Sequence, residues 1–257
     1  MHIGRVVTAE GLRWAVLEGD RVFALRGDPF QGAVERGEPL GPAGAAIWRA
    51  PCVPSKIVAV GRNYIAHARE QNADVPPEPL IFLKPPSAVI GPGEPIRLPP
   101  QSQQVEHEAE LAVVIGRRGH RIPEDRAWEY ILGVTCGNDV TARDLQRRDG
   151  QWTRSKGFDT FCPLGPWIVT HLSPQEIADL EILCRVNGEV RQRGRVREMV
   201  FSIPALIAYI SAIMTLEPGD VILTGTPAGV GPLRPGDWVE VEIPGVGVLG
   251  NPVVPAE

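Results

Sequence analysis

The chain has 257 residues, of which 43% are hydrophobic and 22% are charged, and its formal net charge is −5 at pH 7. This composition is that of a globular protein with a substantial buried core. The negative net charge argues against nucleic acid as a partner. No apolar run approaches the ~20 residues that a membrane helix needs, and the first residues lack the pattern of a secretory signal. We therefore expect no membrane association and a cytoplasmic location.

The first 53 residues predict a small β domain made of hairpins. Strands are expected at residues 3–7, 13–17 and 21–25, and Glu18-Gly19-Asp20 is typical of a hairpin turn between the last two. Residues 27–43 are rich in Gly and Pro and are expected to form a loop. An apolar segment begins at Lys56, so we expect one domain at 1–53 and a second, catalytic domain at 54–257.

The second domain is expected to be mostly β with few short helices, an α+β arrangement. The 28 Gly and 26 Pro residues favour short strands and tight turns over a helical bundle. Helices are expected after an N-cap at Asn63, at 123–130, at 141–146 and after an N-cap at Ser202, whereas residues 85–100 are expected to be irregular. Strands are expected at 56–61, 80–83, 110–115, 132–138, 166–170, 180–186, 221–224, 238–243 and 246–249.

Two glutamates, Glu108 and Glu110, lie two positions apart at the start of a very apolar strand, so their side chains are expected on the same face. Like charges on one face repel each other unless a positive group lies between them, and Asp139, at the end of another apolar strand, offers a third oxygen ligand. Oxygen ligands select Mg²⁺ or Mn²⁺, with Ca²⁺ as an alternative, over zinc. The E-x-E pattern alone is also typical of a solvated charged face, but the adjoining apolar runs favour the metal site.

A second candidate pair is His67 and Glu70, which lie at i and i+3 of a predicted helix and therefore share one of its faces. A carboxylate beside an imidazole orients it and raises its basicity, which suits a general base that deprotonates water. The alternative is a surface contact on an exposed helix.

The chain has only three lysines, Lys56, Lys84 and Lys156, among 26 basic residues. Lys84 and Lys156 lie in motif-like segments, and Lys156 is a candidate for stabilising an oxyanion. Residues 224–231 are glycine-rich but lack the Gly-Lys-Ser/Thr of a P-loop, which argues against nucleotide binding. Their backbone N–H groups and the Thr226 hydroxyl are instead expected to hold a substrate carboxylate or carbonyl oxygen.

Taken together, these segments closely resemble the fumarylacetoacetate hydrolase family over about residues 56–253. The motifs follow one another in one order: GRNYIAHARE (61–70), FLKPPSAVIGPGEPI (82–96), VEHEAELAVVIG (105–116), GVTCGNDVTARDLQ (133–146), QWTRSKGFDTFCPLGPWI (151–168) and LEPGDVILTGTPAGVG (216–231). The resemblance implies a rolled, mixed β-sheet core that assembles as a homodimer.

The resemblance also implies a role for each matching residue. The Mg²⁺ or Mn²⁺ ligands would be Glu108, Glu110 and Asp139. His67 and Glu70 would lie on a mobile lid helix and activate water, and Lys156 would polarise the substrate. The remaining matching positions are assigned to contacting the substrate or bracing the site: Arg62, Tyr64, Lys84, Arg143, Gln146, Gly225 and Thr226.

In this family the cation would chelate a 2-oxo or 2,4-dioxo acid and stabilise its enolate. The chain looks most like the bacterial branch that contains 2-hydroxyhepta-2,4-diene-1,7-dioate isomerases and decarboxylases and acylpyruvases, which implies a role in aromatic catabolism. Hydrolysis of a C–C bond in an acylpyruvate or fumarylpyruvate and decarboxylation of oxaloacetate are the alternatives. A different class is a non-catalytic protein that binds a metal and an oxo-acid.

Overall fold

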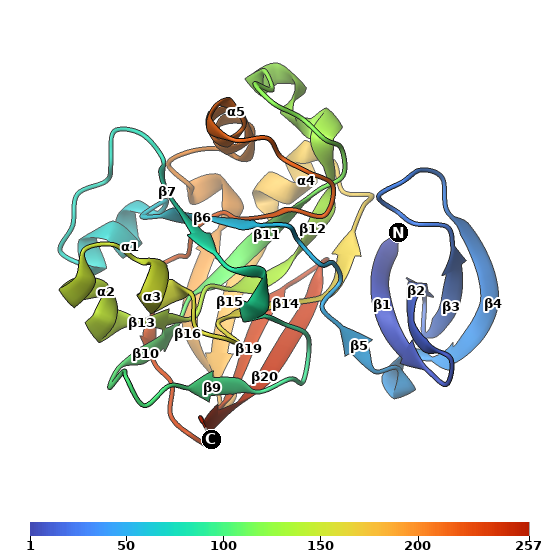
Figure 1. Ribbon diagram of the computed structural model, residues 1–257, viewed down its shortest axis with the longest axis horizontal. Coiled ribbons are helices and arrows are strands. Elements are labelled where there is room, and N and C mark those ends of the chain that lie inside the picture. The colour runs from blue at the N-terminus through green and yellow to red at the C-terminus, as the bar shows by residue number, and fades with distance from the viewer. Residues whose placement is uncertain (257) are drawn as a thin grey trace.

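The computed structural model describes residues 1–256, and it confirms a mostly β protein with few short helices (Figure 1). The strands are β1 (His2–Thr8), β2 (Gly11–Glu18), β3 (Arg21–Arg26), β4 (Glu35–Pro42), β5 (Trp48–Arg49), β6 (Ile57–Gly61), β7 (Leu80–Lys84), β8 (Val89–Ile90), β9 (Ile96–Leu98), β10 (Val105–His107), β11 (Ala109–Ile115), β12 (Ile131–Asn138), β13 (Thr141–Ala142), β14 (Cys162–Val169), β15 (Glu181–Val186), β16 (Glu189–Arg195), β17 (Val221–Leu223), β18 (Gly231–Pro232), β19 (Trp238–Ile243) and β20 (Gly247–Pro255). The α-helices are α1 (Ile65–Glu70), α2 (Arg143–Asp149), α3 (Thr153–Lys156), α4 (Pro174–Asp179) and α5 (Ile203–Ile213).

The largest sheet has a mixed order along its main path, β4-β3-β2-β1-β14-β12-β11-β17-β6-β7. Most neighbours are antiparallel, but β17 runs parallel to β6. Both β6 and β11 are buried along their whole length, as expected for strands covered on both faces. A second sheet has the order β16-β15-β19-β20-β9, and a small third sheet, β13-β10-β18, lies next to the candidate carboxylates.

The four N-terminal strands β1–β4 form a separate curl beside the rest of the molecule (Figure 1). These strands still belong to the largest sheet, since β1 pairs with β14. In this pairing His2 lies opposite Val169 and Ile3 lies opposite Ile168. The three predicted strands are confirmed here. The predicted loop at 27–43 was wrong in part, because β4 lies within it and pairs with β3 despite its glycines and prolines.

Of the two predicted helix caps, one is confirmed and one is wrong. Helix α5 begins after Ser202, whose hydroxyl accepts the Ala205 N–H at 3.2 Å, as predicted. Asn63 is not a cap: α1 begins at Ile65, and the Asn63 amide instead bonds the backbone of Phe201 and Thr224. None of the described helices is long and apolar enough to cross a membrane.

Three further predictions need correction. The helix at 123–130 is a 3₁₀ helix, Glu124–Tyr130. The segment 85–100, predicted to be irregular, contains the two short strands β8 and β9, which pair with β14 and β20. The predicted helical turn at 141–146 is the two-residue strand β13 followed by α2.

Candidate active site

Pairing between β11 and β12 brings the first and last of the three candidate metal ligands together. Glu108 lies in the break between β10 and β11, so the prediction that it shares one continuous strand with Glu110 is wrong. Asp139 follows β12 directly. The Asp139 N–H donates to the Glu108 carbonyl at 2.9 Å. One oxygen from each of the three buried carboxylates lies within 4.8 Å of the others. An all-oxygen set this close together fits a divalent cation such as Mg²⁺ or Mn²⁺.

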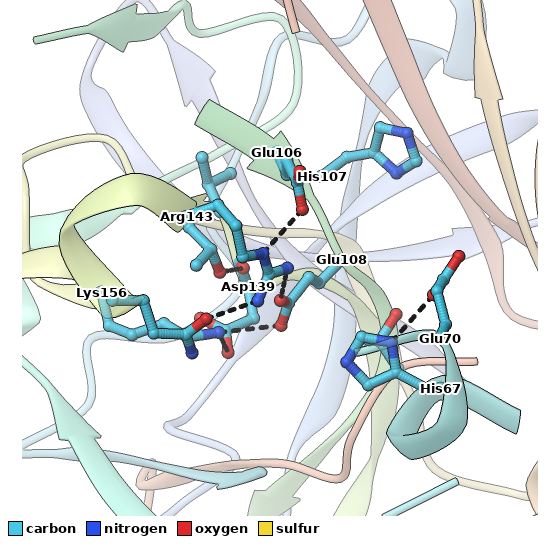
Figure 2. A network of polar contacts seen from close by, with 12 residues as sticks. His67, Glu70, Glu106, His107, Glu108, Asp139, Arg143 and Lys156 are labelled. Carbon is cyan, nitrogen blue, oxygen red and sulfur yellow. Dashed lines mark hydrogen bonds and ion pairs between the residues drawn. The ribbon is translucent and has the colours of Figure 1, made fainter. Parts of the chain in front are cut away.

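Basic side chains compensate two of these carboxylates (Figure 2). Lys156 Nζ donates to Glu108 Oε2 at 2.8 Å and to Asp139 Oδ2 at 2.6 Å. Arg143 bonds Glu108 as well, and its Nε donates to Glu106 Oε2 at 2.7 Å. Burial opposes ionisation of Glu108, but Lys156 and then Arg143 outweigh it and hold the pKa of that carboxyl well below its ordinary value. Burial lowers the pKa of the Lys156 ammonium, but the negative charges of Asp139 and, to a smaller extent, Glu108 outweigh burial and raise it above the ordinary value.

Glu110 is different. Its carboxylate accepts the Gly225 N–H at 2.7 Å, and it has no direct lysine or arginine partner among residues 1–256. Burial, followed by the charges of Asp139 and Glu108, raises the pKa of Glu110 well above its ordinary value. Glu110 is therefore the carboxylate whose charge a bound cation would compensate.

The three carboxylates line a cavity of about 550 Å³. Across it lies His67 on α1, which is 5% exposed and whose Nδ1 contacts Glu70 Oε2 at 3.2 Å (Figure 2). The other oxygen of Glu70 accepts the Gly229 N–H at 3.0 Å. The structure thus brings together the predicted imidazole–carboxylate pair and the predicted metal ligands from segments far apart in the sequence. The predicted residues that line the cavity are Arg62, His67, Glu108, Glu110, Asp139, Arg143, Gln146, Lys156 and Thr226.

Three residues predicted to bind substrate do not line this cavity. Lys84 is buried next to Asp139, to which its Nζ donates at 2.6 Å, and it also donates to the Val140 carbonyl. Gly225 contributes its N–H to Glu110. Tyr64 is 3% exposed, and its buried hydroxyl has no hydrogen-bond partner among the described residues 1–256. Lys84 and Gly225 therefore brace the metal ligands in this geometry.

Sequence reasoning missed four residues that shape the site. Glu106 accepts a hydrogen bond from Arg143, which also binds Glu108. Its position two residues before Glu108, in an alternating series of three glutamates, is the sequence pattern that points to it. Phe82 and Trp152 line the cavity and contact each other edge to face, 5.2 Å between ring centroids, while Lys156 Nζ lies 4.9 Å from the Phe82 ring. Gln192, on β16, had no local signal.

The family model described as fumarylacetoacetate (FAA) hydrolase C-terminal matches residues 56–254. The chain belongs to the fumarylacetoacetate hydrolase family. A second model, described as Rv2993c-like, N-terminal, matches residues 1–48. The predicted resemblance is thereby confirmed, and the protein is an enzyme of this family.

Solved structures similar to the chain share its fold and much of its sequence, and curated relatives share much of its sequence. The 5-carboxymethyl-2-hydroxymuconate delta-isomerase of Mycobacterium smegmatis is 49% identical, with a TM-score of 0.92 and full coverage of both chains. The 2-hydroxyhepta-2,4-diene-1,7-dioate isomerase of Mycobacterium marinum is 46% identical, with a TM-score of 0.91 over 99% of this chain and 98% of that one. Human mitochondrial oxaloacetate tautomerase FAHD2A is 50% identical over 226 residues, 84% of this chain and 72% of the human protein.

Proposed function

We propose that this family member is a divalent-cation-dependent isomerase that moves a proton within a 2-oxo dicarboxylic acid, with a 2-hydroxyhepta-2,4-diene-1,7-dioate as the first candidate substrate. The observation that carries the proposal is that His67 faces the cavity at whose floor Glu108, Glu110 and Asp139 converge. The isomerases of known structure that the chain is similar to support the reaction class.

A cation held by the three carboxylates, Mg²⁺ or Mn²⁺, would supply Lewis acidity that favours the enolate of the bound substrate. Isomerisation then requires one proton to leave the 2-hydroxyl oxygen and one to arrive at a carbon of the conjugated chain. His67 is placed to accept and return such a proton, because it lines the cavity and Glu70 Oε2 orients its Nδ1.

Polar side chains around the floor are placed to orient the substrate. Gln146 Oε1 accepts from Arg143 Nη1 at 2.6 Å, so the Gln146 NH₂ group stays available to donate to a carboxylate. Lys156 Nζ, held between Glu108 and Asp139, supplies positive charge where negative charge develops on the substrate oxygen. Arg62 adds a cationic group to the cavity wall.

Two other reactions are supported by particular observations. The 50% identity to a human oxaloacetate tautomerase favours enol–keto exchange of oxaloacetate, a proton transfer of the same type. The intact His67–Glu70 contact favours water activation and hence C–C hydrolysis of an acylpyruvate or fumarylpyruvate. Decarboxylation of oxaloacetate starts from the same enolate.

An absorbance panel separates these reactions. The protein, loaded with Mg²⁺ or Mn²⁺, is mixed with a hydroxy-diene dioate, enol oxaloacetate, acylpyruvates and fumarylpyruvate, and the products are identified by mass. We expect loss of the diene absorbance without loss of mass from the first substrate. Turnover in excess chelator, or cleavage of acylpyruvates at a higher kcat/KM than isomerisation, would contradict the proposal.

Two predictions about organisation accompany this function. The division into domains 1–53 and 54–257 and assembly as a homodimer follow from the sequence and its resemblance, and sedimentation equilibrium of the full chain tests the dimer. A single species at the monomer mass of 27.9 kDa would contradict it.

A further inference from the structure

The Gln192 side chain joins β16 to the metal-ligand strand and to the loop at 225–229. It is 1% exposed and uses all of its hydrogen-bonding capacity. Its Oε1 accepts the Ala109 N–H at 3.0 Å and contacts His107 Nδ1 at 2.8 Å. Its Nε2 donates to Thr226 Oγ1 and to the Pro227 carbonyl, both at 2.7 Å.

The direction of each of these bonds follows from chemistry. The Pro227 carbonyl can only accept and the Ala109 N–H can only donate, so the amide of Gln192 has one permitted orientation. The Thr226 hydroxyl donates to the Ala109 carbonyl at 2.8 Å and can therefore accept from Gln192. His107 must then donate from Nδ1. A network with a single consistent set of directions is rigid as long as every member is present.

Gln192 bonds Thr226 and Pro227 of this loop, and the loop makes one active-site contact on each side of them. Before them, the Gly225 N–H donates to Glu110. After them, the Gly229 N–H donates to Glu70, the partner of His67. The loop also lies directly against β16: a Cβ added to Gly229 would meet the Arg191 carbonyl at 2.1 Å. One residue therefore anchors the loop that connects the floor of the cavity to its acid–base pair.

We propose that Gln192 is a positioning residue that sets the placement of Glu110 relative to the His67–Glu70 pair through the 225–229 loop. The proposal rests on the proposed function in one respect, the assignment of Glu110 to the cation and of His67 to proton transfer. Its structural part, the anchoring of the loop, is measurable in the metal-free protein without any substrate.

The first test is hydrogen exchange of the metal-free protein with Gln192→Met, which keeps the side-chain length and removes all four bonds. Because each of the four lost bonds changes a local opening equilibrium by about two- to ten-fold, we expect peptides covering 224–231 to exchange at least about ten-fold faster. The matched control is Asn251→Leu, which removes a 1%-exposed amide and its two 2.8 Å bonds on β20, away from the cavity. It is expected to lower the melting temperature without accelerating that loop, and equal acceleration in both variants would overturn the proposal.

The second test compares cation affinity with turnover. Since loss of an outer partner of a metal ligand typically costs 10–100-fold, we expect Gln192→Met to weaken Mn²⁺ binding and to lower kcat by about that factor each, well below the melting temperature. Gln192→Glu keeps the shape and the Oε1 acceptor but replaces the two N–H donors with an oxygen that opposes the Pro227 carbonyl, so we expect a loss of Mn²⁺ affinity and kcat at least as large. Unchanged Mn²⁺ affinity and kcat in both variants would overturn the proposal. If wild-type protein isomerises none of the panel substrates while loop exchange still responds to Gln192→Met, the proposed function fails and the anchoring role stands.

Discussion

The Gly225 N–H donates to the Glu110 carboxylate over 2.7 Å, and no lysine or arginine of residues 1–256 makes a direct ion pair with that carboxylate. Glu108 and Asp139, by contrast, each bind at least one basic side chain. The centre is therefore asymmetric: two ligands are paired with basic side chains, and the third has no such partner in the described part of the chain to compensate its charge.

Removing the uncompensated ligand is expected to remove cation binding. Glu110→Gln keeps the acceptor for Gly225 and should weaken Mn²⁺ binding by more than about 100-fold, since even outer partners of a ligand cost 10–100-fold. Titration calorimetry measures the affinity, and the exposed Glu129→Gln is the control. Wild-type affinity in Glu110→Gln would remove this carboxylate from the proposed centre.

Cation binding is expected to release a proton from Glu110. Its pKa in the metal-free protein is raised, first by burial and then by Asp139 and Glu108, so a proton is bound above the ordinary pKa of a carboxyl. The ligand must be ionised, and the apparent affinity should therefore rise as the pH increases through that raised pKa. Calorimetry at one pH in two buffers of different ionisation enthalpy measures the proton release; identical heats in both would contradict it.

The His67–Glu70 pair is expected to carry the proton transfer of isomerisation. His67→Ala should lower kcat for the hydroxy-diene dioate by about 10²–10⁴-fold, the usual contribution of a positioned acid–base group. Mn²⁺ binding, which is assigned to the three carboxylates, should change little. An absorbance assay of isomerisation and titration calorimetry with Mn²⁺ measure the two quantities, and either an unchanged kcat or an equal loss of Mn²⁺ affinity would contradict this role of His67.

Lys84 is expected to matter for stability. Its Nζ is buried against Asp139 and the Val140 carbonyl, and Lys84→Met would leave that part of Asp139 without its cation. Breaking a buried pair typically costs about 3–5 kcal/mol, whereas Arg126→Met, which breaks the exposed pair with Glu129, should cost about 0–1 kcal/mol. Urea unfolding of the metal-free proteins compares them, and equal small losses would show that Lys84 is not structural.

Features with a local signature could be predicted from the sequence. The first hairpins and α5 with its Ser202 cap follow from alternation and capping chemistry that neighbouring residues encode. Glu108 and Glu110 stood out because they begin a very apolar run, and Asp139 because it follows one; the order of the motifs identified the family. The misplaced Asn63 cap shows the limit, because its amide binds segments more than 130 residues away.

Only the tertiary structure decided how these residues are paired. Lys84 lies 55 positions before Asp139, Gln192 lies 83 positions after Ala109, and Gly225 lies 115 positions after Glu110. Such partners depend on which strands become neighbours and on which way their side chains then point, and no local pattern encodes either. The sequence alone identified the three carboxylates as candidate metal ligands. Their burial and long-range partners decided which two are compensated and which one needs the cation, because the charge of a buried carboxyl depends on the groups that the fold places around it.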